Sequence, residues 1–323
     1  MVKKGSLMVL LAGIAWGISG VSGQYLLHHG VSVNLLTSLR LLISGAFLTL
    51  LAYGRQPQQF AGLLKDKTFL KAVLAYSILG LSFNQYAYLL AIQYSNAGTT
   101  TVLQYLSPVL VLVYTTTKAK VAPSFMELIA IALAISGTVI MSCHGDLSHL
   151  AISPKGLFWG LLSAVTYSYC IIKPAKLIEE IGSLPVIGIA MLMGGFLFAL
   201  VTHSWTYSLE LTASNGLALF GIIGIGTLFA YTVFLKGASL IGPVKASLLA
   251  SVEPVASVIF AILLMKEVFY PIDLMGMALI LLAVLLISFR DLLLYQREKQ
   301  VARLLKRSRK IRYFRGKKRK SML

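Results

Sequence analysis

The chain of 323 residues is too apolar for a soluble globular protein, because 57% of its residues are hydrophobic and only 12% are charged. A soluble domain carries about 25% charged residues, and the mean hydropathy here is +0.82. The formal net charge of +18 is uneven, since the segment from Arg290 onward holds 14 Lys and Arg against Asp291 and Glu298. The composition therefore indicates a membrane protein with a basic C-terminal tail.

Ten apolar runs follow one another along the chain. A hydrocarbon core about 30 Å thick needs about 20 apolar residues per helix, and backbone groups in lipid must be satisfied within the segment. The sequence therefore predicts an all-α membrane protein with ten transmembrane helices. The predicted helices span Leu7–Leu27, Val33–Tyr53, Phe69–Ala91, Gly98–Thr117, Ser124–Cys143, Gly156–Ile172, Leu184–His203, Leu217–Leu235, Pro243–Met265 and Ile272–Phe289.

The positive charges of the loops predict the orientation. With the N-terminus in the cytoplasm, only Lys155 and Lys266 fall in outside loops. The cytoplasmic segments hold Lys3, Lys4, Arg55, Lys65, Lys67, Lys118, Lys120, Lys173, Lys176 and Lys236. An even number of helices places the C-terminal tail in the cytoplasm too. We therefore expect a multi-pass protein of the cell membrane with both termini cytoplasmic.

Two stretches of the chain follow one design. Gly242–Glu267 is a membrane-length run that carries Glu253 directly before Pro254 and closes on Glu267, and Asn96–Lys120 is a similar run around Pro108. Aligning the two prolines also brings the lysines at the ends of the stretches into register without a gap. The chain is therefore expected to contain two copies of one membrane unit.

The two halves begin alike, with Lys-Gly before the first helix of each, and Trp16 falls at the place of Tyr167. An odd number of five helices per half makes the second half enter the membrane from the opposite side, as in the inverted repeats of secondary transporters. Small-residue pairs that allow close helix approach occur at Gly13/Gly17 and Gly156/Gly160. The predicted units are a first repeat at 1–143, an outside linker at 144–155, a second repeat at 156–289 and a cytoplasmic tail at 290–323.

No enzyme motif is present: the sequence has no P-loop, no HExxH and no Gly-x-Ser-x-Gly. We expect no enzymatic activity, no cofactor and no metal site. The histidines are scattered outside or at helix edges, and the two cysteines are interpreted as small packing residues. These residues are His28, His29, His144, His149, His203, Cys143 and Cys170.

Three charged residues within the predicted helices need an explanation, because each costs about 2.5–3.5 kcal/mol to insert. Arg40 is a candidate to pair with a substrate carboxylate or with Glu253, and a structural ion pair or helix cap is the alternative. Glu253 stands beside a proline that frees carbonyls of the preceding turn. It is a candidate to carry a proton, hold a substrate amine or gate the cavity, with bonding between helices as the structural alternative. Lys245 is one turn into its helix, where snorkelling to the cytoplasmic face is the simpler interpretation.

Polar and aromatic residues inside the predicted helices form a second candidate set. Amide and hydroxyl groups fix a polar solute while rings cover its apolar part. The alternative is hydrogen bonding between helices, worth about 0.6 kcal/mol each. The candidates for substrate binding are Trp16, Asn84, Tyr88, Gln104, Tyr105, Tyr167 and Tyr231.

The tail from Arg290 to Lys320 combines apolar residues at near-helical spacing with mostly basic positions. This pattern predicts a basic amphipathic helix on the cytoplasmic leaflet, attracted to anionic lipid by about 1 kcal/mol per basic residue. Nucleic-acid binding is the alternative. We expect no nucleic-acid partner, because the attached helices hold the tail at the membrane.

Two five-helix units that each close on an SPV or EPV helix, followed by Lys266-Glu267 and a last helix with Gly276, resemble the drug/metabolite transporter superfamily of EamA type. The resemblance covers about residues 4–289. The first half departs from the family pattern, with Lys120-Val121 where the family often has Gly-Glu. The resemblance implies transport of small organic solutes such as amino acids or related metabolites.

The leading hypothesis is a secondary transporter, an exporter, that works by alternating access between two inverted halves. In it, Arg40 orients an anionic group and Glu253 responds to protonation or gates the cavity. One alternative is a transporter of lipid-like or drug substrates. The other is a membrane scaffold or sensor that moves nothing and recruits partners through its basic tail. The oligomeric state is left open.

Overall fold

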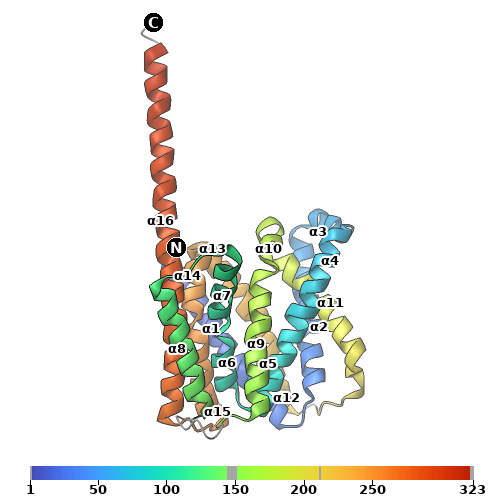
Figure 1. Ribbon diagram of the computed structural model, residues 1–323. Coiled ribbons are helices and arrows are strands. Elements are labelled where there is room, and N and C mark those ends of the chain that lie inside the picture. The colour runs from blue at the N-terminus through green and yellow to red at the C-terminus, as the bar shows by residue number, and fades with distance from the viewer. Residues whose placement is uncertain (1, 144–150, 211, 321–323) are drawn as a thin grey trace.

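The computed structural model describes residues 2–143, 151–210 and 212–320, and all its regular elements within these ranges are helices. Figure 1 shows them as a bundle from which one long helix projects. In chain order the elements are α1 Val2–His28, α2 Val33–Arg55, α3 Pro57–Leu63, α4 Lys67–Ala75, η1 Tyr76–Ser82, α5 Phe83–Tyr94, α6 Ala97–Gln104, α7 Ser107–Ala119, α8 Phe125–Cys143, α9 Pro154–Ile172, α10 Ala175–Ile181, α11 Ser183–Thr202, η2 Ser204–Thr206, α12 Ala213–Leu219, η3 Phe220–Phe229, α13 Ala230–Ile241, α14 Pro243–Ala250, α15 Val252–Met265 and α16 Pro271–Lys320.

Eight helical segments of the described chain are long and apolar enough to cross a membrane. They are Lys3–His28, Val33–Arg55, Ala97–Ala119, Phe125–Cys143, Ser183–Thr202, Ala213–Ile241, Lys245–Met265 and Pro271–Arg297. The other two predicted segments are also helical, forming α4–η1–α5 and α9. Polar residues such as Asn84 and Gln85 lower the hydropathy of the first, so ten membrane crossings stay a prediction.

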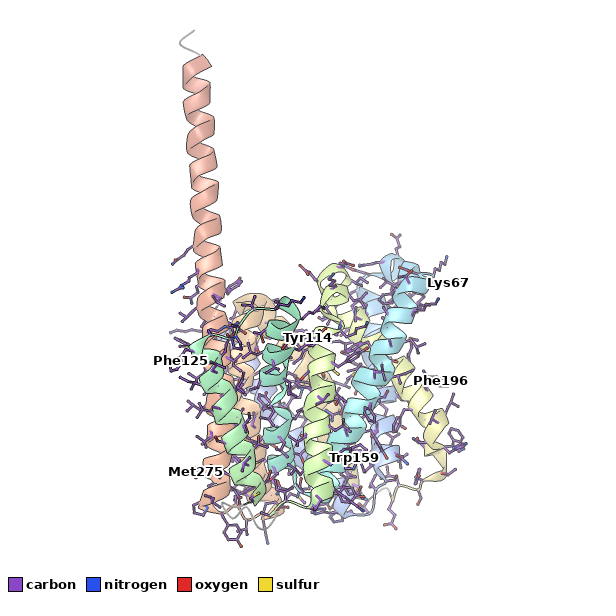
Figure 2. All side chains as sticks on the ribbon, viewed as in Figure 1. Lys67, Tyr114, Phe125, Trp159, Phe196 and Met275 are labelled. Carbon is purple, nitrogen blue, oxygen red and sulfur yellow. The ribbon has the colours of Figure 1, made fainter. Side chains whose placement is uncertain are left out.

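Large apolar side chains face outward along the bundle. Phe125 on α8 is 79% exposed and Phe196 on α11 is 59% exposed, and Figure 2 shows both pointing away from the neighbouring helices. Soluble proteins rarely expose contiguous apolar surface of this kind. The outer surface is therefore suited to lipid.

Several helices differ from the predicted runs. The runs at 98–117 and 243–265 are each interrupted, between α6 and α7 and between α14 and α15. The runs at 69–91 and 217–235 each contain a π-helical stretch, η1 and η3. Short helices α3 and α10 occupy loops in which no helix was predicted.

Helix α16 continues across the predicted boundary at 289/290 as far as Lys320. Figure 1 shows this extension in line with the rest of α16 rather than folded back beside the bundle. A contact of the tail with the leaflet therefore stays a prediction. Within the bundle, Arg290 of α16 forms an ion pair with Glu127 of α8, which ties the two helices near the start of the extension. The N-terminus lies at the same end of the bundle, together with α3 and α10.

Two helix pairs form opposite edges of the bundle, α2 with α11 and α8 with α16 (Figure 1). A Cβ at Gly45 would lie 2.4 Å from the backbone nitrogen of Leu192, and a Cβ at Gly195 would lie 2.8 Å from that of Leu42. Residue numbers rise along one helix as they fall along the other, so α2 and α11 run antiparallel.

The α8/α16 pair also packs closely at glycines. A Cβ at Gly137 would lie 2.6 Å from the carbonyl oxygen of Gly276, and one at Gly276 would lie 2.9 Å from the nitrogen of Met141. Gly137 also faces Ile280, so these helices also run antiparallel. In both edge pairs the absence of a side chain lets the backbones approach closely.

The centre of the bundle is built around α1 and α9. Helix α1 packs against η3, α13 and α15, and α9 packs against η1, α5 and α6. A Cβ at Gly17 would lie 2.8 Å from the nitrogen of Ser257, and one at Gly160 would lie 2.6 Å from the Leu103 side chain. The structure thus places these glycines at close helix contacts, as their spacing predicted.

Candidate functional site

A small polar cavity of about 60 Å³ lies between the central helices. We call it the polar cavity. It is much smaller than the about 300–1,000 Å³ of a typical small-molecule pocket. It is lined by Trp16, Ser19, Gly20, Arg40, Asn84, Gln85, Tyr88, Gln104, Tyr167, Tyr231 and Glu253.

Arg40 of α2 is held by two neutral acceptors. Its Nε donates to Oγ1 of Thr227 at 3.2 Å, and its Nη1 donates to Oε1 of Gln85 at 2.9 Å. Its side chain is buried, with the residue only 7% exposed. In the described part of the chain, no carboxylate lies within ion-pair distance of it. The guanidinium therefore reaches the cavity with its charge uncompensated by a direct ion pair.

The π-helical stretch η3 places the acceptor for Arg40. In a π-turn the hydrogen-bonding ladder is locally widened, and such turns occur frequently at functional sites. Thr227 lies within η3 and is fully buried, and its hydroxyl donates to the carbonyl of Ile222, five residues earlier, at 3.0 Å. The same oxygen accepts from Arg40, so the irregular turn and the charged residue are linked directly.

Glu253 of α15 lines the same cavity as Arg40, directly before Pro254, which disturbs the helix. Proline has no N–H to donate, so the carbonyl of Ala250, four residues earlier, lacks its usual helical partner. The Tyr105 hydroxyl lies 3.0 Å from that carbonyl oxygen and 2.9 Å from Oε2 of Glu253. A single hydroxyl hydrogen thus faces two acceptors whenever Glu253 is ionised.

Amide and hydroxyl groups join the helices around the cavity. Asn84 of α5 donates to the carbonyl of Ser163 at 2.9 Å and to Oγ1 of Thr166 at 3.0 Å, both on α9. The Tyr88 hydroxyl lies 2.8 Å from Oγ1 of Thr101 on α6. Asn84 and Tyr88 therefore serve as ties between helices as well as lining groups.

Aromatic rings cover the cavity on the side of α13. The ring centroids of Trp16 and Tyr231 lie 5.7 Å apart in an edge-on arrangement, and Trp16 lies 5.2 Å from Phe234. Edge-to-face ring packing of this kind is favourable. The wall is apolar but retains the Tyr231 hydroxyl.

A buried amide joins three segments of the chain near the C-terminal end of α1. The fully buried Gln24 donates to Oε1 of Glu267 at 2.5 Å and accepts from the backbone nitrogen of Ala97 at 2.8 Å. We call this contact the Gln24 bridge. It links α1, the start of α6 and the segment after α15, at the end of the bundle opposite α3 and α10 (Figure 1).

The structure brings most of the predicted site residues together. Eight of the ten line the polar cavity, and Tyr105 stands behind Glu253. Lys245 is exposed on α14 and does not line the cavity, in keeping with the snorkelling interpretation. Direct pairing of Arg40 with Glu253 does not occur among the described residues.

Three lining residues were not predicted: Ser19, Gly20 and Gln85. Gln85 follows Asn84 directly, so an intramembrane amide pair was the available signal. Gly20 is one turn from Trp16, and a Cβ there would lie 2.8 Å from the Tyr88 hydroxyl. Its small size therefore makes room for that hydroxyl.

The cavity combines a cation, a carboxylate, amides and hydroxyls in a small space lined by several helices. Chemically, a guanidinium such as that of Arg40 can pair with a carboxylate, and a carboxyl group such as that of Glu253 can accept an amine or exchange a proton. Among the described residues, no group of three or more His, Cys, Asp or Glu is arranged to hold a metal ion.

Known proteins share this sequence and fold. The EamA-like transporter family matches residues 3–143 and 154–289. An uncharacterized inner membrane transporter of Salmonella typhimurium, YicL, is 36% identical over 287 residues, which is 88% of this chain and 95% of the relative. An uncharacterized transporter of Bacillus subtilis, YetK, is 25% identical over 290 residues, 87% of this chain and 86% of that protein.

A chain of known crystal structure has a similar fold, with a TM-score of 0.60, 18% identity, and coverage of 88% of this chain and 97% of that one. At this identity the likeness concerns the fold alone. The two family matches cover most of the chain and confirm the resemblance drawn from its repeated helices. The chain belongs to the EamA-like transporter family.

Proposed function

We propose that the protein is a secondary transporter that exports small organic solutes, such as amino acids or related metabolites, by alternating access between two inverted five-helix repeats. The observation that carries this proposal is the polar cavity, in which Arg40 and Glu253 approach one space from different helices. Ionisable groups at membrane depth are costly and mark substrate or ion pathways.

The helix packing supports the inverted repeat. If the halves are equivalent, α2 corresponds to α11 and α8 to α16. Each of these pairs runs antiparallel, as expected for repeats threaded in opposite senses. Helix α1 of the first half packs against η3, α13 and α15 of the second half, and α9 of the second half packs against η1, α5 and α6 of the first. Repeats threaded in the same sense would make equivalent helices run parallel.

Local irregularities recur at equivalent places and support the same proposal. Helix α6 ends at Gln104 and α14 ends at Ala250, each just before the proline of its stretch. Lys120 and Lys266 then cap the C-terminal ends of α7 and α15, both in the left-handed conformation with φ of 53° and 56°. Such matched departures from a regular helix indicate two copies of one design.

The cavity chemistry supports a solute with a negative group and a proton-linked cycle. A solute carboxylate would take the free directions of the Arg40 guanidinium, in a bidentate pairing that arginine favours. Protonation of Glu253 would supply the missing hydrogen between its carboxyl group, Tyr105 and Ala250. At about 60 Å³ the cavity is much smaller than the about 300–1,000 Å³ of small-molecule pockets, so alternating access must enlarge it to admit an organic solute.

The proposal is tested by comparing metabolites inside cells and in the medium, with and without the protein. A solute that builds up outside only when the protein is present identifies the cargo, and uptake into inverted vesicles then measures transport directly. In that assay Arg40→Ala is expected to abolish transport while the protein reaches the membrane at normal levels. Arg40→Lys keeps the charge but loses the paired geometry and is expected to retain partial activity. Undiminished transport by Arg40→Ala would remove Arg40 from the site.

The alternative substrates give a different outcome in the same experiment. Lipid-like or drug substrates would leave the polar metabolites unchanged, while cells with the protein would gain resistance to apolar compounds. For the scaffold alternative, no solute would move and the isolated tail from Arg290 to Lys320 would capture a protein partner.

A further inference from the structure

A second, much larger hollow of about 620 Å³ opens at the end of the bundle that carries α3 and α10 (Figure 1). We call it the basic hollow. Pockets that bind small organic molecules have about 300–1,000 Å³. It is lined by Leu51, Ala52, Arg55, Gln56, Gln59, Phe60, Leu63, Ile181, Gly182, Ser183, Leu184, Pro185, Thr232, Leu235, Lys236 and Ser239.

The charges of the basic hollow have one sign. Arg55 at the end of α2 and Lys236 on α13 both line it, and none of its lining residues is acidic. Both cations are exposed, and neither is in an ion pair among the described residues. A cleft lined by charge of one sign raises the local concentration of the opposite charge. The hollow therefore favours an anion over a cation of the same size.

Apart from these cations, apolar side chains from several helices line the hollow. Leu51 and Leu235 come from α2 and α13, Phe60 from α3, and Leu184 from the start of α11. Phe60 is only 7% exposed, so α3 closes one side as a fixed wall. A molecule that contacts both the two cations and the apolar side chains has an apolar body and one anionic group.

The basic hollow borders the polar cavity. Thr232 lines the hollow and its neighbour Tyr231 lines the cavity. The turn of α13 that carries Tyr231, packed edge-on against Trp16, therefore stands between the two spaces. Successive residues of one turn of α13 thus face the two spaces.

We propose that the basic hollow is a binding site for amphipathic organic anions, which hold their charged group at Arg55 and Lys236 before passing Tyr231 toward Arg40. The passage toward Arg40 rests on the proposed function, whereas binding in the hollow does not. The anion comes either from solution, as a carboxylate solute, or from the membrane, as an anionic lipid. Both sources share the chemistry that the hollow recognises.

Two probes with one fluorophore and opposite charge test the binding. Dansylglycine carries a carboxylate and dansylcadaverine carries an amine, and the dansyl group brightens in apolar surroundings. The full chain in nanodiscs of zwitterionic lipid is titrated with each probe, with empty nanodiscs as the blank. We expect tighter binding of dansylglycine and a loss of about tenfold or more in its affinity in the double variant Arg55→Gln/Lys236→Gln.

The matched control is Lys173→Gln/Lys176→Gln. It removes two charges near α10 from residues that do not line the hollow, and it is expected to bind dansylglycine as the unmodified chain does. Equal affinity for the two probes, or an equal effect of both double variants, would overturn the proposal.

A second arm identifies the source of the anion. Nanodiscs that contain phosphatidylglycerol will displace dansylglycine if the natural occupant is a lipid, and will leave its binding unchanged if the occupant is a solute. Either result supports a site for amphipathic anions and assigns its source. Charge-selective binding without transport of any solute would contradict the proposed function alone. Active transport without charge-selective binding would contradict this inference alone.

Discussion

Gly45→Ala tests the close approach of two helix backbones at one edge of the bundle. The added Cβ would lie 2.4 Å from the nitrogen and 2.7 Å from the Cα of Leu192, whereas ordinary contacts begin at 3.4 Å. Both neighbours are backbone atoms of α11, which cannot rotate away as a flexible side chain would. The two helices must therefore separate by about 1 Å, and overpacking of this kind costs about 1–3 kcal/mol.

Gly54→Ala is the matched control, because Gly54 lies on the same helix and a Cβ added there would have nothing within 4 Å. Replacing glycine by alanine inside a helix stabilises it by about 1 kcal/mol, and Gly54, one residue before the end of α2, gains no more than this. The difference between the variants is therefore set mainly by the packing cost of about 1–3 kcal/mol, or about 2–6 °C in apparent melting temperature at about 2 °C per kcal/mol.

Thermal unfolding of the purified variants measures this difference, and transport assays measure its effect on the site. Arg40 is five residues from Gly45 on α2. A shift of that helix would stretch the bonds of Arg40 to Thr227 and Gln85, now 3.2 and 2.9 Å long. Gly45→Ala should therefore melt lower and transport more slowly than Gly54→Ala. Equal melting temperatures would refute the described packing of α2 on α11.

Two further predictions concern the ends of the bundle. Gln24→Leu keeps a similar volume but leaves Ala97 N–H and the Glu267 carboxylate without their amide partner, a cost of about 1–3 kcal/mol. To measure this, a cysteine replaces the buried Ser257 in a chain without its native cysteines, with and without Gln24→Leu. The Gln24→Leu chain should react several-fold faster with an impermeant thiol reagent added outside. An unchanged rate would show that the Gln24 bridge does not restrict access. Truncation after Arg297 keeps the Arg290 ion pair and should leave transport unchanged, as measured in vesicles, whereas lost transport with normal insertion would make the tail part of the transport cycle.

The site residues were predictable because polar groups avoid lipid. Arg40, Asn84 and Glu253 lie inside apolar runs, so burial against other helices was their only low-cost location. The structure places all three around one cavity. Their role in binding a solute stays a prediction, since packing alone shows proximity and not transport.

Other features depend on contacts that spacing along the chain does not encode. Thr227 in the π-helical stretch accepts a hydrogen bond from Arg40 of a helix distant in sequence, and the Ala250 carbonyl at the end of α14 accepts one from the Tyr105 hydroxyl of the other half. The short helices α3 and α10 have only seven residues each, so they carry too little periodicity to distinguish them from loops. Lys245 was a candidate by its place in an apolar run, but it lies in the first turn of α14 and its side chain is exposed.

The unbroken course of α16 has a mechanical consequence. An α-helix rises 1.5 Å per residue, so the 23 residues that follow Arg297 extend α16 by about 35 Å beyond its apolar part. If the transport cycle tilted α16 by about 10°, the tip of the helix would move by about 6 Å. The extension would thus amplify a helix tilt that is hard to detect within the bundle. A fluorophore near the tip, paired with one on α3, would turn each cycle of the halves into a readable change of distance.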